Sequence, residues 1–213
     1  MEQLRIRAYL QTPVISDKHL PLDAILYYHH VRQHMGEELI SKPGESTVRE
    51  QNVPLLPLLK GGRKDDTWFY HCSFAQWPEK TVEKSSFKVK QGDWLRHSDY
   101  LTDKTKKIDA QRGKFKAYHI KMYYRHAEYV EWYCVGLKDK IMQLLQFCTA
   151  IGKNTGDGWG QVLRWEVQPW PEDWSIRGHN NKLMRAVPYD KGIPYGVRPS
   201  YWNPKHIFRC IVP

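Results

Sequence analysis

The residues with the clearest chemical potential are four glycines within nine positions, in the stretch Gly152-Lys-Asn-Thr-Gly-Asp-Gly-Trp-Gly160. Glycine allows a positive φ and a close approach by another molecule, so successive backbone N–H groups in such a stretch can form a nest for a phosphate. Walker and dinucleotide-binding loops use glycines to begin a helix, whereas these glycines follow a predicted helix, whose negative end repels anions. This position disfavours a nucleotide-hydrolysing loop. A structural role, as a helix C-cap and a tight turn, remains the alternative to phosphate binding.

Histidines are the candidates for catalysis. A histidine beside a tyrosine or lysine could cleave RNA by activating a 2′-hydroxyl and protonating the leaving oxygen. The alternative is that these side chains are structural or contact phosphate, and no metal-ligating or nucleophile motif accompanies them, so the sequence predicts no metal and no cofactor. The candidates are His29 and His30 in a predicted helix, and His119 and His126 beside Lys121 and Tyr123.

A basic segment at residues 80–116 carries most of the net charge. It holds eleven Lys and Arg against five Asp and Glu, so +6 of the chain's +10 lies in 37 residues. Aromatic residues in or beside it offer faces on which bases could stack, which suits nucleic-acid binding, and the alternative is a solvated loop. Its densest part contains Arg112, Lys114 and Lys116, followed by Tyr118.

The overall composition limits the class of protein. The chain has 213 residues, 41% of them hydrophobic, and no apolar run long enough to cross a membrane. No export signal opens the sequence, so we expect a cytoplasmic protein. The four cysteines lie far apart without a C-x2-C pair, which disfavours zinc and predicts reduced thiols in the core. The cysteines are Cys72, Cys134, Cys148 and Cys210.

The elements that must position these residues follow from the hydrophobic periodicity. Alternation predicts strands, and three-to-four spacing predicts helices, of which the second ends at Gly152 as a C-cap. The two strands near residues 118–135 could pair as a hairpin, and the last 45 or so residues look irregular. We expect strands at residues 3–11, 68–74, 118–125, 129–135 and 161–167, and helices at residues 21–36 and 137–151.

Without the basic insertion, this order is strand, helix, strand, strand, helix, strand. It predicts an α+β, ferredoxin-like (RRM-like) βαββαβ domain, with an antiparallel sheet and two helices on one face. We expect a single domain at residues 1–188, interrupted by an insertion at residues 76–116, and an irregular extension at residues 189–213. The fold hosts many functions and establishes none of them.

The sequence has a glycine-rich loop between its second predicted helix and its last predicted strand. In this it resembles the RAMP superfamily of CRISPR-associated RNA-binding proteins. The ordered set of motifs is most similar to the Cas5-like subunit of type IV effectors, over roughly residues 1–188. These motifs are Leu20-Pro-Leu-Asp-Ala-Ile-Leu, Trp68-Phe-Tyr-His-Cys-Ser-Phe-Ala, Val130-Glu-Trp-Tyr-Cys-Val-Gly, Ile151-Gly-Lys-Asn-Thr-Gly-Asp-Gly-Trp-Gly-Gln-Val, Asp173-Trp-Ser and Met184-Arg-Ala-Val-Pro.

The resemblance implies a non-catalytic subunit that holds the 5′ handle of a CRISPR RNA and caps the backbone filament of the complex. Its implied protein partners are a Cas7-like backbone subunit and a large, Cas8-like subunit, and contact with target DNA stays open. It implies neither a membrane nor a homo-oligomer. The implied RNA contacts are Gly152, Lys153, Asn154, Thr155, Gly156, Gly158 and Trp159, with Arg112, Lys114, Lys116 and Tyr118 from a thumb-like insertion. A metal-independent endoribonuclease that processes CRISPR repeat RNA is the alternative.

Overall fold

The protein combines antiparallel strands with two helices, which confirms the mixed α and β content predicted from the sequence. The structure is a computed structural model that describes residues 1–35, 55–62, 67–90, 111 and 116–213. The helices are α1 (Leu22–Met35) and α2 (Lys138–Leu145). The strands are β1 (Glu2–Leu10), β2 (Lys60–Gly61), β3 (Phe69–Tyr70), β4 (Val82–Lys90), β5 (Tyr118–His126), β6 (Tyr129–Gly136), β7 (Val162–Pro169), β8 (Val187–Gly196) and β9 (Ile207–Ile211).

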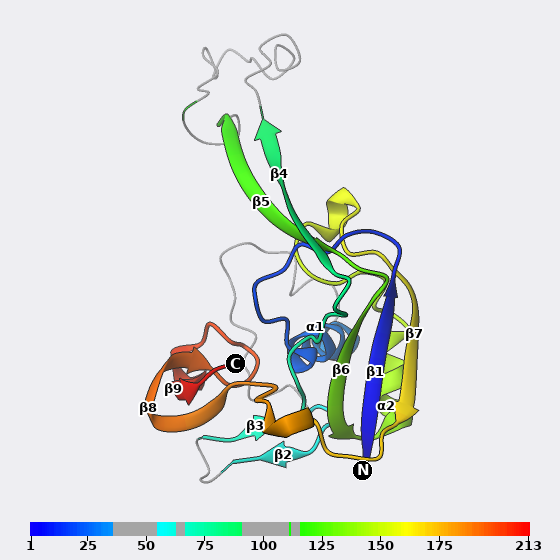
Figure 1. The fold of residues 1–213 in the computed structure, drawn as a ribbon, viewed down its shortest axis with the longest axis vertical. Coiled ribbons are helices and arrows are strands. Elements are labelled where there is room, and N and C mark those ends of the chain that lie inside the picture. Colours follow the sequence, from blue (N-terminus) through cyan, green and yellow to red (C-terminus); the bar gives the residue numbers. More distant parts are fainter. Residues whose placement is uncertain (36–54, 63–66, 91–110, 112–115) are drawn as a thin grey trace.

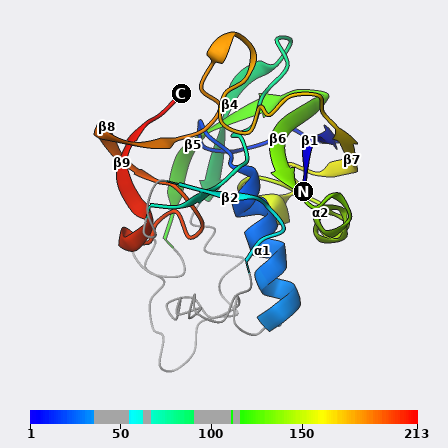
Figure 2. The same ribbon diagram turned by 90° about the horizontal axis from the view of Figure 1, so that it is seen from below.

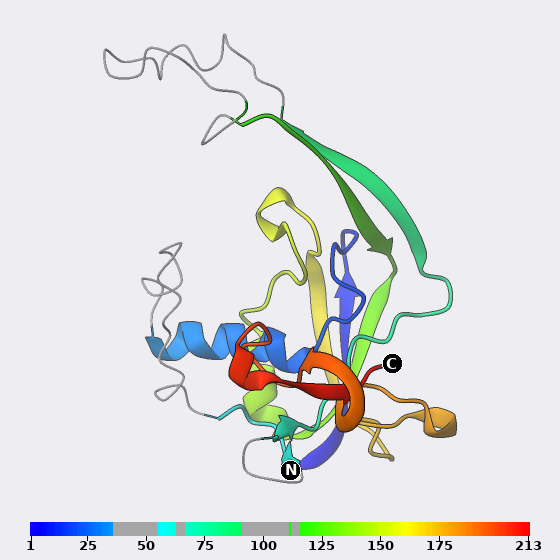
Figure 3. The same cartoon turned by 90° about the vertical axis from the view of Figure 1, so that its left-hand side faces the viewer.

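A three-stranded sheet of order β6-β1-β7 forms the centre, and β1 pairs antiparallel with both neighbours. Leu4, Ile6 and Ala8 are fully buried on one face of β1, as their alternation predicts. Both helices cover that face (Figures 2 and 3). The strands predicted at residues 3–11, 118–125, 129–135 and 161–167 and the helix predicted at residues 21–36 are therefore confirmed as β1, β5, β6, β7 and α1.

The predicted strand at residues 68–74 is only partly regular. Phe69 and Tyr70 form β3, and the following residues run beside β6 through isolated bridges at Cys72 and Gln76. The other edge of this segment is already used, because the Phe74 N–H donates to the Met184 carbonyl at 2.8 Å. The Tyr70 and Cys72 carbonyls likewise accept hydrogen bonds from the Arg185 guanidinium. These contacts replace a regular strand ladder along that edge.

The predicted hairpin of residues 118–135 is wrong. Strand β5 pairs with β4, in a register that runs from Val82 opposite His126 to Lys90 opposite Tyr118. Strand β6 pairs instead with β1. The long β4–β5 ribbon projects from the body of the molecule (Figure 1). Strand β4 lies inside the basic segment, where most side chains are exposed on both faces and no apolar period marks a strand.

Helix α2 is shorter than predicted. It ends at Leu145 with Gln146 as the C-cap, and Gly152 is not its cap. Cys148 and Ile151 are still buried, but an irregular segment carries them into the core. Trp165 holds this segment by donating from Nε1 to the Cys148 carbonyl at 2.7 Å.

The C-terminal region is not wholly irregular, because β8 and β9 form an antiparallel ribbon within it. Strand β8 is interrupted by Pro188, Gly192 and Pro194, and its register with β9 shifts between Pro188 and Ile193. These residues break the alternation of apolar side chains, so the sequence pattern did not predict the strand. Gly192 lies directly against the backbone of Cys210, so the two strands approach closely there. We expected an irregular extension at residues 189–213, and this ribbon corrects that expectation.

A buried ion pair ties the C-terminal region to the central domain. Asp23 and Arg185 are 0% and 1% exposed, with 3.9 Å between the Asp23 carboxylate and the guanidinium. Arg185 also donates to the Val197 carbonyl at 2.6 Å, and Tyr201 donates to Asp23 at 2.6 Å. Asp23, Tyr70 and Arg185 each belong to a different sequence motif of the resemblance. Those three motifs therefore meet at this buried ion pair, where their residues stabilise the fold.

All four cysteines are free and buried, which confirms their predicted place in the core. Burial raises the pKa of Cys72 and Cys148 to about 12, and that of Cys210 to about 11. Because the thiolate is the reactive form, we expect the folded protein to react with Ellman's reagent at about pH 8 far more slowly than the protein in guanidinium. Rapid release of a full equivalent from the folded chain would contradict this burial.

Candidate nucleic-acid interface

The glycine-rich loop is anchored to the segment that follows β1. The Lys153 N–H donates to the Ile15 carbonyl at 2.6 Å, and the Gly160 N–H donates to the Pro13 carbonyl at 2.8 Å. The Asp157 and Gly158 amides bond within the loop, around the short 3₁₀ turn η5 (Thr155–Asp157). Backbone carbonyls therefore occupy the amides of Lys153, Asp157, Gly158 and Gly160, which leaves residues 154–156 as the part of the loop where a phosphate nest can lie. The predicted nest stays a prediction.

The glycines of the loop serve different purposes. Gly152 and Gly160 have φ of 87° and 67°, and a Cβ at either would collide with the carbonyl of Ile15 or Ile151. Gly158 has φ of 89° but open space around it. Gly156 has neither a positive φ nor any atom within 4 Å of a built Cβ. Nothing within the described chain requires glycine at 156, so this position is open to another molecule.

The glycine-rich loop lies against the ribbon formed by β4 and β5. Lys88 of β4 forms an ion pair with Asp157. The Asn154 side chain contacts the Met122 sulfur at 3.2 Å, and the Trp159 and Tyr124 rings lie 5.1 Å apart. These contacts come from one face of the ribbon. The glycine-rich loop and the basic segment, which the sequence pointed to separately, therefore form one surface.

The other predicted RNA contacts lie further out or outside the described residues. Tyr118 is at the far end of β5, opposite Lys90, and Lys116 is exposed beyond it. Arg112 and Lys114 lie outside the residues that the structure describes. Within the loop, the Lys153 ammonium pairs with Asp17 at 2.6 Å, and both side chains are more than half exposed. Thr155 contributes its carbonyl, which accepts from the Gly158 N–H at 3.1 Å.

The histidines proposed for catalysis do not converge. His119 and His126 lie at opposite ends of β5, and their odd spacing of seven residues puts them on opposite faces of the strand. His119 stacks on Phe87, with 4.4 Å between the ring centroids and an angle of 11°. The Lys121 ammonium lies over the Tyr123 ring, 5.1 Å from its centroid. His119, Lys121 and Tyr123 thus share one face of β5, and His126 lies on the other face. Whether these groups catalyse a reaction stays a prediction.

Comparison with known proteins identifies the family. Residues 2–213 match the family described as CRISPR type IV associated protein Csf3. The chain belongs to the Csf3 family. The match covers nearly the whole chain and confirms the resemblance to a Cas5-like type IV subunit, and it implies other subunits of a type IV complex as partners. No curated protein matches the chain.

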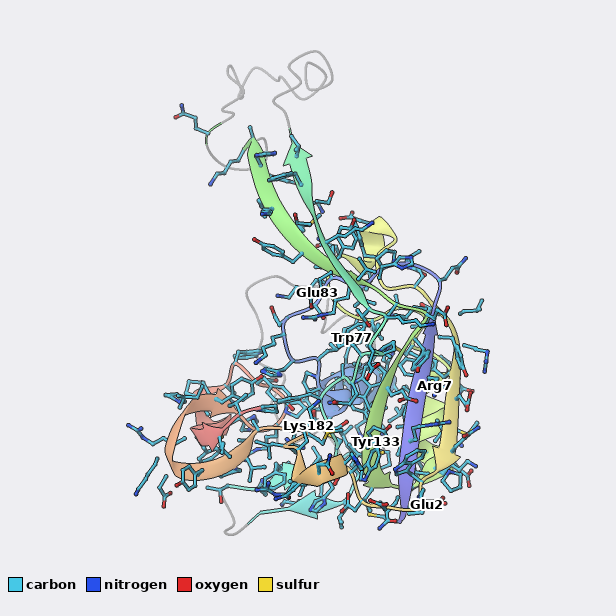
Figure 4. The ribbon with its side chains drawn as sticks, in the orientation of Figure 1. Glu2, Arg7, Trp77, Glu83, Tyr133 and Lys182 are labelled. Carbon is cyan, nitrogen blue, oxygen red and sulfur yellow. The ribbon has the colours of Figure 1, made fainter. Side chains whose placement is uncertain are left out.

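Sequence reasoning missed a second basic surface in this Csf3-family chain. A groove of about 660 Å³ lies between residues 14–18 and the base of the ribbon, where Lys18 and Lys84 line it. Arg125 fixes this corner by bonding Glu83 at 2.7 Å and by lying over the Trp77 ring. Figure 4 labels Glu83 and Trp77 at this corner. Lys84 belongs to the basic segment, but no local pattern marks Lys18, because the ribbon meets it only in the fold.

The uncovered face of the central sheet is nearly neutral in the Csf3-family chain. Arg7 pairs with Glu131 at 2.6 Å, and Arg5 approaches Glu166 at 3.4 Å (Figure 4). Tyr9 donates to Glu166 at 2.9 Å, and this hydrogen bond lowers the pKa of the Glu166 carboxyl. The arginines are thus already paired with carboxylates. An RRM-type RNA contact through the sheet face is disfavoured by these acids.

One group of side chains resembles a catalytic triad by composition only. The Ser175 hydroxyl lies 3.3 Å from His71 Nδ1, and Asp173 lies 3.6 Å from the same nitrogen. A triad needs the nucleophile and the orienting carboxylate on different imidazole nitrogens. The His71 Nε2 edge faces Gly61 instead. This cluster therefore holds residues 173–175 against the domain.

No helix in the described ranges is long and apolar enough to cross a bilayer.

Proposed function

We propose that this Csf3-family chain is a non-catalytic, RNA-binding subunit of a type IV CRISPR ribonucleoprotein. It binds the 5′ handle of the CRISPR RNA and caps a filament of Cas7-like backbone subunits, beside a large Cas8-like subunit, in the cytoplasm. Its domain is ferredoxin-like in this proposal, with residues 71–76 as the outer strand beside β6. The proposal rests on family membership and on the single surface formed by the glycine loop and the basic ribbon.

The loop suits phosphate despite its position after a helix. The dipole of a helix acts within its last turn, and α2 ends at Leu145, seven residues before Gly152. The negative helix end therefore does not lie within the loop. The Lys153–Asp17 pair is exposed on both sides, and exposed pairs contribute little stability, so a phosphate can replace the carboxylate. Gly156 then allows the RNA backbone to approach.

The test of this function is binding to a guide RNA transcribed from the host CRISPR array. The double variant Lys153→Ala/Asn154→Gly removes two loop side chains, and glycine preserves the left-handed backbone at 154, where φ is 57°. We expect about tenfold weaker binding, equal to about 1.4 kcal/mol, with unchanged thermal unfolding. Lys140→Ala, at an exposed position on α2, is the matched control. Equal affinity of the double variant and the wild type would remove the loop from the interface.

The alternative function is a metal-independent endoribonuclease that uses His119 or His126, and it is tested with the same RNA. The protein alone is incubated with repeat RNA in EDTA. We expect intact RNA, because His119 already stacks on Phe87 and Lys121 already lies over the Tyr123 ring, so neither is arranged as an acid or base toward a substrate. Specific cleavage that His119→Ala or His126→Ala abolishes would establish the nuclease instead.

A further inference from the structure

A groove separate from the ribbon runs along α1. Its volume is about 930 Å³, within the range of sites that hold small molecules. One wall is the α1 face that carries Ala24, Tyr28 and Arg32, whose spacing puts them on the same side of the helix. The opposite wall is the segment from Phe147 to Lys153, which leads directly into the glycine loop.

Two aromatic side chains are exposed inside this concave site. Tyr28 is 46% exposed on α1, and Phe147 is 57% exposed on the opposite wall. Tyr28 is held in place, because His29 packs edge-on against its ring and Arg32 reaches its hydroxyl at 3.5 Å. Aromatic rings left open in a groove are available to stack on a flat ligand.

The charge of the groove selects an anionic ligand. Among the described residues, Lys18, Arg32 and Lys153 line it, against a single acid, Asp17. Burial lowers the pKa of His19 and His29, so both imidazoles act there as neutral hydrogen-bonding groups. A ligand that combines a flat aromatic ring with a phosphate matches this set of side chains, and a nucleotide has both.

We infer that the α1 groove binds one unstacked nucleotide of a single-stranded RNA, with its base against Tyr28 and Phe147 and its phosphate near Lys153. This inference rests on the proposed function, because the same strand passes from the groove to the glycine loop. Lys153 belongs to the glycine loop and also lines the α1 groove, so the nucleotide in the groove and the phosphate at the loop are neighbours along the RNA. The groove thereby fixes one base at a defined distance from the loop.

Fluorescence of 2-aminopurine tests this contact with the full chain. Eight octaadenylate RNAs each carry one 2-aminopurine, at successive positions. We expect the wild-type protein to change the fluorescence strongly at one or two positions and weakly elsewhere. Tyr28→Ala and Phe147→Ala should abolish that positional signal and weaken binding about tenfold, whereas Tyr28→Phe, which keeps the ring, should retain it. Met142→Ala is the control, because Met142 is 48% exposed on α2 and does not line the groove.

The outcomes separate this inference from the proposed function. Octamer binding with no positional signal, or a signal unchanged in Tyr28→Ala and Phe147→Ala, would overturn the groove and leave the loop's role standing. Failure of the octamers and the guide RNA to bind would overturn both. Displacement of the RNA by octaglutamate as readily as by unlabelled RNA would assign the groove to an acidic peptide. Saturation by free adenosine monophosphate without octamer binding would assign it to a free nucleotide.

Discussion

Replacing Arg185 with methionine should lower the free energy of unfolding by about 3–5 kcal/mol. The guanidinium is 1% exposed and serves the Asp23 carboxylate together with four backbone carbonyls, those of Tyr70, Cys72, Ala186 and Val197. Methionine fills a similar volume but leaves a carboxylate buried without its cation and removes one donor from each of these carbonyls. Urea unfolding followed by circular dichroism measures the change.

Asp23→Asn should cost much less, about 1–2 kcal/mol. Burial raises the pKa of Asp23 despite the nearby Arg185, because the surroundings penalise the charged carboxylate. Asparagine still accepts the hydrogen bond from Tyr201, and Arg185 keeps its carbonyl partners. Arg177→Met is the matched control, because Arg177 is exposed and its side chain bonds Asn181, four residues away, in the part of the chain that the structure describes. Equal losses for Arg185→Met and Arg177→Met would refute the central role of this pair.

The sequence predicts best those elements that have one buried face, although alternation at residues 118–125 also predicted β5, which has no fully buried side chain. Leu4, Ile6 and Ala8 alternate because one side of β1 covers the core, and the same logic identifies α1 and β7. Strand β4 has no such face, since both of its sides are largely exposed and its partner is β5. Strand β8 is interrupted by proline and glycine. Periodicity is silent for both, because it reports burial and not strand pairing.

The candidate site was predictable only in its local parts. The glycine loop is visible as a cluster of one residue type, but the contact between Lys88 and Asp157 joins positions 69 apart. The partner of Asp23 was equally hidden, because that residue suits the positive end of α1 by sequence and instead meets Arg185, 162 positions later. Lys18 and Tyr28 carry no motif at all. Such residues become candidates only when the fold shows the groove that they line.

The glycines of the loop should separate stability from binding. Gly160→Ala should lower the free energy of unfolding by about 3 kcal/mol, because alanine at φ of 67° is strained and its Cβ collides with the Ile151 carbonyl. Gly156→Leu should leave unfolding almost unchanged, since the space around that position is open. It should weaken guide RNA binding by about tenfold or more if the RNA backbone approaches there.

These two substitutions must be measured in both assays, because a destabilised loop also binds poorly. Gly160→Ala reports the cost of losing the loop's conformation, and Gly156→Leu reports the cost of filling the space outside it. A structural turn without a ligand predicts that Gly156→Leu is neutral in both assays. An RNA contact predicts normal unfolding with weakened binding for Gly156→Leu alone. The result at position 156 therefore decides whether these clustered glycines only connect α2 to β7 or also admit a partner.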